Sequence, residues 1–345
     1  MHRVAAIDCG TNSIRLLIAD ISSKAGDIER TAGSRDGSAP LTDVAREMRI
    51  VRLGEGVDRT GRLSEAALER TMTALREYAG LIGASALSPG MGSSRPPFPL
   101  EAIRMVATSA TRDAANAQEF TDRVVEVLGV PPEVISGGDE ARLSFTGATR
   151  ELFGTTLGER ACLPPYLVTD IGGGSTEFVL GGPEAAGPGG QVAGTSVNIG
   201  CVRLTERHLR ADPPRPAEIA ATIADIDAAL EQAAASVPVA KASTLVGLAG
   251  SVTTVAAIAL GLRGYDPARI HHSRVPAARV HEIAGELLAM TRAERAAIPV
   301  MHPGRVDVIG AGALILDRIM SGFGFDEVLV SEHDILDGIA WSLVP

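Results

Sequence analysis

The sequence predicts an α/β fold built from two similar halves, and three observations support this prediction. The 345 residues are enough for two domains and too many for one small core. Apolar runs at 4–7 and 166–170 are each followed by the spacing Asp-x-Gly-x-x-Ser and a second apolar run. Segments with helical spacing alternate with further apolar runs. Such an internal repeat indicates a duplicated architecture, and the cleft between two halves is a usual place for a ligand.

In the first half, two apolar runs flank a tight polar turn, which is typical of strand, turn and strand. Ser64 can cap a helix whose apolar positions recur at helical spacing. A stretch with four prolines over 85–99 is interpreted as a surface insertion. The expected elements are strands over 4–7, 14–21 and 103–107, a loop over 22–43, and helices over 64–81 and 116–128.

In the second half, prolines at 131 and 132 mark a break before the next group of elements. The segment 242–262 has no charged side chain and approaches the length of a membrane span, but glycine, serine and threonine residues interrupt it. A strand, a glycine turn and a buried helix explain it better than a membrane span. The expected elements are strands over 134–136, 166–170, 177–180 and 327–331, a flexible turn over 181–194, and helices over 139–153, 216–236, 305–321 and 334–343.

The overall charge limits the class of partner. A net charge of −10 argues against a general nucleic-acid binder, although a local basic patch can still bind a polyanion. Nearly all basic residues are arginines, whose planar fork suits phosphate, but a GC-rich genome is the simpler explanation of this bias. Three cysteines without zinc-like spacing, and an N-terminus without a long apolar core, indicate a reducing, cytoplasmic location without a membrane anchor.

The segment 170–177 is the strongest candidate for a phosphate-binding loop. It supplies Gly172, Gly173 and Gly174, whose backbone N–H groups can approach a ligand closely, with hydroxyls at Ser175 and the next residue. The flanking carboxylates, Asp170 and Glu177, would repel phosphate unless a divalent cation such as Mg²⁺ lies between them. A tight hairpin without a ligand is the structural alternative.

Two other loops are weaker candidates. The loop 8–13 contains Asp8, Asn12 and Ser13, and Arg15 would point to the same face of a strand as Ser13. Its residues also suit a plain turn, so its value depends on its match to the second loop. At 247–254, close packing of a helix on a strand is as good an explanation as ligand contact. The sequence contains neither a Walker P-loop nor a dinucleotide fingerprint.

A possible acid–base group lies at the start of the helix expected over 139–153. Hydrolysis of a phosphoanhydride needs an oriented water, charge neutralisation and often a base. Asp139 and Glu140 are placed where the helix dipole favours carboxylates, so a simple N-terminal cap is an equal alternative.

Four motifs occur in an order that is specific as a combination. They are Asp8-x-Gly-Thr-Asn-Ser-Ile-Arg, Ala107-Thr-Ser-Ala-Thr-Arg-Asp, Ile135-Ser-Gly-x-x-Glu-Ala-Arg-Leu and Asp170-Ile-Gly-Gly-Gly-Ser-Thr-Glu. Together they resemble the exopolyphosphatase/guanosine pentaphosphate phosphatase (Ppx/GppA) family, in its short two-domain form. The resemblance extends through 247–254 to 331 and therefore covers nearly the whole chain.

The resemblance implies duplicated actin-like ATPase domains of the ribonuclease H-like class, with an interdomain cleft. Domain I would cover 1–136, with the C-terminal helix, about 332–345, packed back on it, and domain II would cover 137–331. The implied functional residues fall into three groups. Glu140 is the water-activating base; Asp170, Glu177 and Asp8 are the metal-associated acids; and Asn12, Ser13, Arg15, Arg112, Gly172, Gly173, Gly174 and Ser175 bind phosphate.

The implied activity is release of terminal orthophosphate from inorganic polyphosphate, with Mg²⁺ or Mn²⁺ as cofactor and a monovalent cation such as K⁺ as a further candidate. The chain departs from the family at Asp139, where a glutamate is common, and at Asp337, where an Arg-Glu pattern is common. Longer members have an extra helical part, and its absence from this sequence favours short polyphosphate or a nucleotide. A homodimer is left open.

Three alternatives to this activity stay open. The protein could be a pppGpp 5′-phosphohydrolase acting on the guanosine alarmone. It could be an actin-fold kinase that transfers the γ-phosphoryl group of ATP to a second acceptor. It could also be a weakly catalytic protein that binds polyphosphate or (p)ppGpp. With 3% aromatic residues, the chain offers little base-stacking surface to argue for nucleotide recognition.

Overall fold

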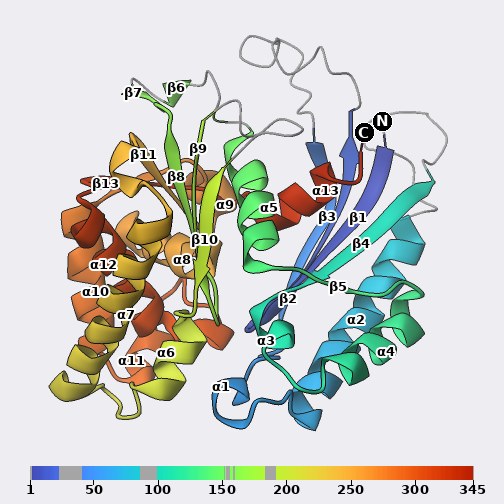
Figure 1. Cartoon of the computed structure of the whole chain (residues 1–345), viewed down its shortest axis with the longest axis horizontal. Helices are drawn as coiled ribbons and strands as arrows, with labels where there is room; N and C mark the ends of the chain where they lie inside the picture. The colour runs from blue at the N-terminus through green and yellow to red at the C-terminus, as the bar shows by residue number, and fades with distance from the viewer. Residues whose placement is uncertain are drawn as a thin grey trace. The chain divides into compact units, whose positions relative to one another are not determined.

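The computed structural model describes residues 2–22, 41–85, 99–150, 152, 156–157, 160–182 and 192–344. The chain divides into two compact units. Unit 1 comprises Met1–Ser136 and Ile335–Pro345, and unit 2 comprises Gly137–Asp334. Each unit is a mixed α/β structure with its own sheet and its own buried apolar cluster (Figure 1).

The sheet of unit 1 has five strands in the order β3-β2-β1-β4-β5. The strands are β1 (His2–Cys9), β2 (Ser13–Ile21), β3 (Leu41–Ile50), β4 (Leu100–Ala107) and β5 (Glu133–Val134). The first three pair antiparallel, and β4 and β5 add in parallel to β1. Nearly every residue of β1 is buried, because apolar side chains cover both faces of the sheet.

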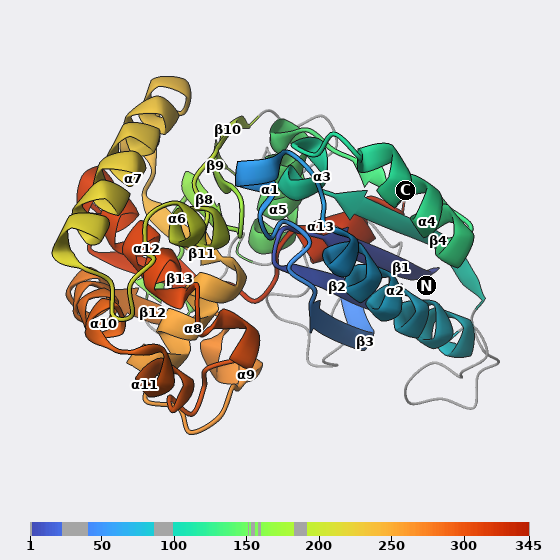
Figure 2. The same cartoon turned by 90° about the horizontal axis from the view of Figure 1, so that it is seen from below.

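Helices pack on both faces of this sheet. On one face, α2 (Glu65–Ser85) buries Leu68, Met72 and Leu75 against β1 and β2, and α4 (Ala117–Leu128) packs beside α2 (Figure 2). On the other face lies α13 (Ile335–Trp341), which contacts β1, β2 and β4. The C-terminal helix therefore completes unit 1, although unit 2 precedes it in the chain.

The sheet of unit 2 has six strands in the order β10-β9-β8-β11-β13-β12. The strands are β8 (Tyr166–Ile171), β9 (Thr176–Gly181), β10 (Ala193–Val197), β11 (Thr244–Leu248), β12 (Arg274–Pro276) and β13 (Glu327–Val330). The first three are again antiparallel, and β11 and β13 again follow in parallel. Strand β12 is added antiparallel at the edge.

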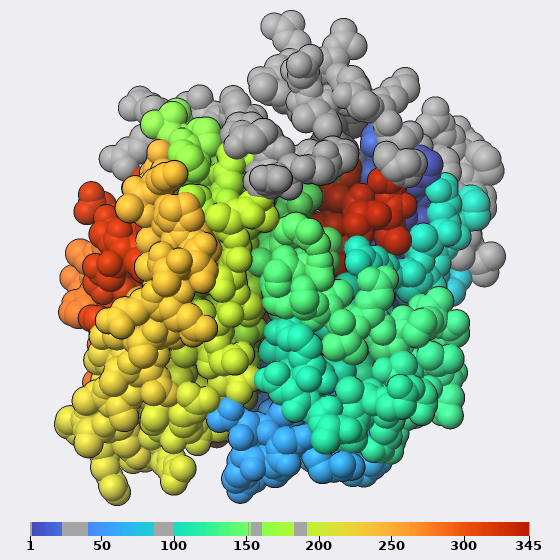
Figure 3. All heavy atoms as spheres, in the orientation of Figure 1, coloured from blue at the N-terminus to red at the C-terminus, as the bar shows by residue number. Residues whose placement is uncertain are grey.

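The helices of unit 2 bury the larger of its apolar clusters. A layer of α7 (Pro216–Ser236), α8 (Ala249–Ala259), α10 (Ala277–Ala289) and α12 (Ile309–Phe323) supplies most of this core. In the space-filling view, α7 (yellow) forms part of the visible face of this unit (Figure 3). On the other side of the sheet, α5 (Gly137–Thr149) packs on β8, β9 and β10.

Shorter elements connect these parts of the two units. They are α1 (Val57–Thr60), α3 (Ser109–Arg112), α6 (Cys201–Arg207), α9 (Pro267–Ile270), α11 (Arg292–Ala296), the 3₁₀ turns η2 (Val239–Lys241) and η3 (Pro303–Arg305), and the two-residue strands β6 (Thr156–Leu157) and β7 (Arg160–Ala161).

The same strand order and directions therefore occur twice, which is the actin-like plan, and the predicted fold class is confirmed. The strand, glycine turn and buried helix expected over 242–262 are β11 and α8. Within the described part of the chain, every helix falls short of the length and hydropathy that a bilayer crossing needs. The three cysteines are buried and free.

Two predicted loops are wrong at their ends. Residues 41–43 belong to β3, and β10 begins within the turn predicted over 181–194. Both are strands whose side chains are only partly buried, so their sequences lack a continuous apolar run. The rest of those two predictions, 23–40 and 183–191, lies outside the described residues, as does 86–98 of the predicted insertion.

Asp337, where the sequence departs from the family pattern, has a structural partner in unit 1. Its carboxylate accepts hydrogen bonds from Nη1 and Nη2 of Arg46 on β3, at 3.3 and 2.6 Å. The Asp337 side chain is 2% exposed and that of Arg46 is 31% exposed. The ion pair therefore ties α13 to the sheet.

We expect Asp337→Ala to destabilise the protein by about 2 kcal/mol. Breaking a fully buried pair costs roughly 3–5 kcal/mol, and the partial exposure of Arg46 reduces this value. Urea unfolding monitored by circular dichroism measures the difference. Asp43→Ala is the matched control, because Asp43 is the exposed second partner of Arg46 and should matter less. Equal effects of the two substitutions would contradict the prediction.

Candidate functional site: two matching hairpin loops and a carboxylate cluster

The two predicted loops have the same backbone closure. In unit 1 the N–H of Gly10 donates to the carbonyl of Ser13, and in unit 2 the N–H of Gly172 donates to that of Ser175, both at 3.0 Å. A Cβ on Gly172 would lie 3.0 Å from the Ser175 carbonyl oxygen, so a side chain there would crowd the turn. The repeated Asp-x-Gly-x-x-Ser spacing thus produces the same tight turn twice.

The carbonyl groups of the second loop are all held by the start of α6. The N–H groups of Cys201 and Val202 donate to the carbonyls of Gly172 and Gly173, at 3.0 and 2.9 Å. Nε of Arg203 donates to the carbonyl of Gly174 at 2.7 Å. The chain approaches closely here, since a Cβ on Gly200 would lie only 2.4 Å from the Gly173 carbonyl oxygen.

With the carbonyls turned to α6, the loop presents its N–H groups on the other side. Within the described residues, the N–H groups of Gly173 and Gly174 have no hydrogen-bond acceptor. Successive N–H groups that are free of acceptors form an anion-binding concavity, and the absence of side chains permits close approach. The loop is therefore built to receive a phosphate oxygen.

The first loop is held in the same way by a different segment. The carbonyl of Asn12 accepts from the N–H groups of Val51 and Arg52, at 3.0 and 2.8 Å, and that of Thr11 accepts from Gly54 at 2.9 Å. A Cβ on Gly54 would lie 2.2 Å from Cγ2 of Thr11, so this contact requires glycine. Among the described residues, the buried Oδ1 of Asn12 has no donor.

Three carboxylates gather beside the second loop. Asp170 at the end of β8 faces Glu177 near the start of β9 in the strand register, and Glu140 comes from the first turn of α5. All three are buried. Oγ of Ser144, on α5, donates to Asp170 at 2.9 Å, and Oγ of Ser196, on β10, donates to Glu177 at 2.7 Å.

This environment disfavours a negative charge on Glu177. Burial raises its pKa well above the usual value, and repulsion from Glu140 and Asp170 raises it further. Hydrogen bonds from Ser196 and Ser175 oppose the shift only in part. A bound cation would relieve the repulsion, so the cluster has the electrostatics of a cation site.

The first loop has the opposite charge balance at the equivalent positions. Asp8 faces Arg15 in the strand register, where unit 2 has Asp170 facing Glu177. Nε and Nη2 of Arg15 both donate to one carboxylate oxygen of Asp8, at 3.0 and 2.7 Å. The duplicated hairpins have therefore diverged, with an Asp–Arg pair in unit 1 and an Asp–Glu pair in unit 2.

The second phosphate-binding candidate of unit 1, Arg112, lies at the end of α3. This helix is joined to the first loop, because Oγ1 of Thr11 and Oγ of Ser109 are 2.9 Å apart. Nη1 of Arg112 donates to the carbonyl of Ile135 at 2.9 Å. The structure thus groups Arg112 with Asn12, Ser13 and the Asp8–Arg15 pair in unit 1, and Glu140 with the second loop in unit 2.

In the third predicted loop, 247–254, the described contacts are packing contacts within unit 2. Close packing explains Gly247, where a Cβ would lie 2.8 Å from Cγ1 of Val252. At Gly250 a Cβ would lie 2.4 Å from the guanidinium carbon of Arg305, whose Nη1 donates to Thr254 at 2.9 Å. The sequence did not single out Arg305, since only the fold brings η3 to the start of α8.

A metal would need ligands beyond the protein. Among the described residues, no three His, Cys, Asp or Glu side chains form a group that could hold a metal ion by themselves. Mg²⁺ is usually bound by one or two carboxylates, with water and phosphate oxygens as its other ligands. Asp170 and Glu177 fit that mode, because they form a buried, repelling pair next to an anion-binding turn.

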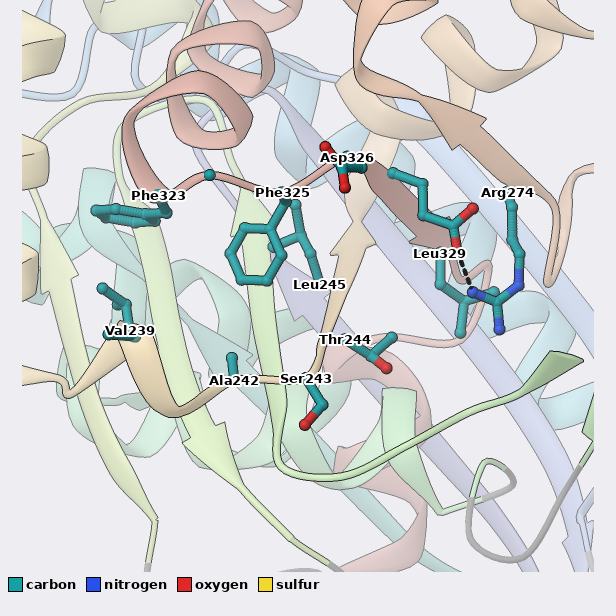
Figure 4. Close-up of a pocket in the computed structure, with 13 residues that line it drawn as sticks. Val239, Ala242, Ser243, Thr244, Leu245, Arg274, Phe323, Phe325, Asp326 and Leu329 are labelled. Carbon is teal, nitrogen blue, oxygen red and sulfur yellow. Dashed lines mark hydrogen bonds and ion pairs between the residues drawn. The ribbon is translucent and has the colours of Figure 1, made fainter.

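A cavity of about 630 Å³ in unit 2 is separate from this site. It lies where β11 and β13 begin, and Thr244, Leu245, Arg274, Phe323 and Phe325 are among the residues around it (Figure 4). Asp170 pairs with Leu248 at the opposite end of β11. The cavity and the carboxylates therefore lie at opposite ends of the central strands.

A duplicated hairpin, with N–H groups in unit 2 that have no acceptor among the described residues and that lie beside buried carboxylates, is the arrangement expected of a phosphate-handling protein of the actin-like class. The chain belongs to the Ppx/GppA phosphatase family, whose model matches residues 31–345. The resemblance seen in the sequence motifs is thereby confirmed.

Similar proteins were found in several species. Over 99% of both chains, the protein is 47% identical to exopolyphosphatase 2 of Mycobacterium tuberculosis. It is 40% identical to an exopolyphosphatase-like protein of known crystal structure, with a TM-score of 0.84 and coverage of 99% of this chain and 98% of that one. It is 28% identical to the guanosine-5′-triphosphate,3′-diphosphate pyrophosphatase of Aeromonas salmonicida, over 99% of this chain and 59% of that protein.

We expect Glu177→Gln to stabilise the metal-free protein at neutral pH. The folded state binds a proton on Glu177 more tightly than the unfolded chain does. The stability from this group is therefore fully present below the usual glutamate pKa and is lost as the pH rises through the raised pKa. Removal of the Glu177 charge should raise the free energy of unfolding by about 1.4 kcal/mol for each unit by which the pKa of Glu177 is raised.

Thermal unfolding in EDTA at about pH 8 and about pH 4 measures this difference, which should disappear at the acid pH, where both proteins are neutral at this position. The exposed Glu231 of α7 provides the control substitution, Glu231→Gln, which should have little effect. A Glu177→Gln protein that is less stable at both pH values would contradict the prediction.

Proposed function

We propose that this protein is an exopolyphosphatase that releases terminal orthophosphate from inorganic polyphosphate, with a preference for short chains. The observation that supports this most is the second hairpin, where free N–H groups lie next to the buried pair Asp170 and Glu177. The full-length similarity to an exopolyphosphatase supports the choice of substrate.

In this proposal the second loop binds the terminal phosphoryl group. The N–H groups of Gly173 and Gly174 donate to its oxygens, while the N–H of Gly172 closes the turn on the Ser175 carbonyl and the Ser175 hydroxyl orients Glu177. Asp170 and Glu177 would hold Mg²⁺, which would supply positive charge to offset the charge on the transferring group. Mn²⁺ is a candidate replacement, and a K⁺ ion is a further candidate.

The groups of unit 1 are assigned to the neighbouring phosphates of the chain. Asn12, Ser13 and Arg112 supply donors, and Arg15 supplies a guanidinium that is already oriented by Asp8. Because Arg15 occupies Asp8, we assign the metal to the acids of unit 2 in preference to Asp8. Units 1 and 2 are then the two actin-like domains of the proposal.

Glu140 is assigned to the water. It accepts a proton from the attacking water while the water oxygen bonds to the terminal phosphorus and the bridging P–O bond breaks. The bridging oxygen leaves on the shortened chain, and orthophosphate is released. Glu140 is buried beside Asp170 and Glu177, which places its carboxylate close to the acids assigned to the metal.

We expect Glu140→Ala to lower kcat by about 10²- to 10⁴-fold, the usual contribution of a general base. Binding of polyphosphate should be retained, because the donors in both loops are unchanged. Phosphate release and calorimetric binding measure the two effects. Asp139→Ala is the matched control, because Asp139 is exposed and pairs with Arg142 on the same helix. Turnover near the parent value in Glu140→Ala would exclude the assigned role.

The substrate is tested by Mg²⁺-dependent phosphate release from short polyphosphate, long polyphosphate and pppGpp in parallel. We expect the highest kcat/KM with short polyphosphate. Preference for pppGpp would replace the proposed function with the second activity of the family. Binding without phosphate release would identify a sensor, and transfer of phosphate to an added acceptor would identify a kinase.

A further inference from the structure

We infer that Ser196 is a positioning residue for the proposed reaction. It donates a hydrogen bond to Glu177, and it packs directly against the start of helix α5, which carries Glu140. The inference rests on the proposed function. No motif in the sequence singled out this serine, which lies on β10, outside the four motifs.

The hydrogen bond to Glu177 has a fixed geometry. Ser196 and Glu177 are directly opposite in the antiparallel register of β10 and β9, so their side chains lie on the same face of the sheet. Oγ of Ser196 donates to Oε1 of Glu177 at 2.7 Å. This hydrogen bond between directly opposite residues fixes the orientation of the Glu177 carboxylate.

The packing contact joins Ser196 to the start of α5. A Cβ on Gly137 would lie 2.5 Å from Cβ of Ser196 and 3.0 Å from its Oγ, so only glycine permits this approach. Gly137 is the first residue of α5, and Glu140 lies within the same turn. The side chain of Ser196 therefore touches the turn that contains the base while it orients the acid.

Such a residue should affect the metal and the chemical step more than substrate affinity. Partners that orient a ligating carboxylate typically contribute a factor of 10–100 to metal affinity or activity. We expect Ser196→Ala to lower Mn²⁺ affinity and kcat by about that factor, while KM for short polyphosphate changes by less than about threefold. Ser196→Thr keeps the hydroxyl and should restore most of both.

Mn²⁺ binding without substrate is measured by electron paramagnetic resonance, and kcat and KM by phosphate release. Thr195→Ala is the matched control, because it removes a hydroxyl from the adjacent residue, whose side chain points to the opposite face of β10. Thermal unfolding verifies that each variant is folded. If Ser196→Thr is unstable, Ser196→Cys replaces it as the variant that keeps a weak donor.

The outcomes separate the two proposals. If the parent protein binds Mn²⁺ but releases no phosphate, the proposed function is wrong, and the effect of Ser196→Ala on Mn²⁺ affinity still tests the positioning role. If the parent is active and Ser196→Ala matches Thr195→Ala in Mn²⁺ affinity and kcat, Ser196 is not a positioning residue. A loss in Ser196→Ala that Ser196→Thr or Ser196→Cys restores supports the inference.

Discussion

The site depends on the crowding of three carboxylates in a buried space. Glu140, Asp170 and Glu177 come from α5, β8 and β9, and repulsion from the first two raises the pKa of Glu177. The fold maintains this arrangement through the strand register that sets Asp170 opposite Glu177, and through serine hydroxyls on two of the acids. Under the proposed function, a bound cation would relieve the repulsion that the cluster maintains.

The duplication explains why this crowding occurs once. Both units build the same turn and hold its carbonyl groups away from the exposed N–H groups. Among the positions at which the two hairpins differ, one changes the sign of a charge, where unit 1 has Arg15 and unit 2 has Glu177. In unit 1 the guanidinium of Arg15 forms an ion pair with Asp8. In unit 2 the second carboxylate repels Asp170, and a positive charge would reduce this repulsion. One change of sign thus gives two related loops different chemical tasks.

Much of this could be predicted from the sequence. The helix over 216–236 matches α7 from end to end, because a proline at its start and a continuous helical pattern mark its limits. Strand β3 was missed, since its partly buried side chains alternate too weakly to be recognised. The Asp-x-Gly-x-x-Ser turns were recognised, and the family that their motifs indicated is confirmed. Ser144, Ser196 and the segment 51–54 were not found, because each makes its contact with a different element of the fold that its own local sequence does not indicate.

The place of α13 also affects how the chain folds as it is synthesised. Unit 2 is continuous, so its sheet and helices can assemble once Asp334 has left the ribosome. Most of unit 1 is synthesised first, but β1 and β2 cannot pack against α13 until Ile335–Trp341 has been synthesised. One apolar face of its sheet therefore stays without α13 while unit 2, Gly137–Asp334, is synthesised. A nascent chain stalled before Ile335 would therefore expose an apolar sheet surface that is prone to aggregate, which is the kind of surface that chaperones bind.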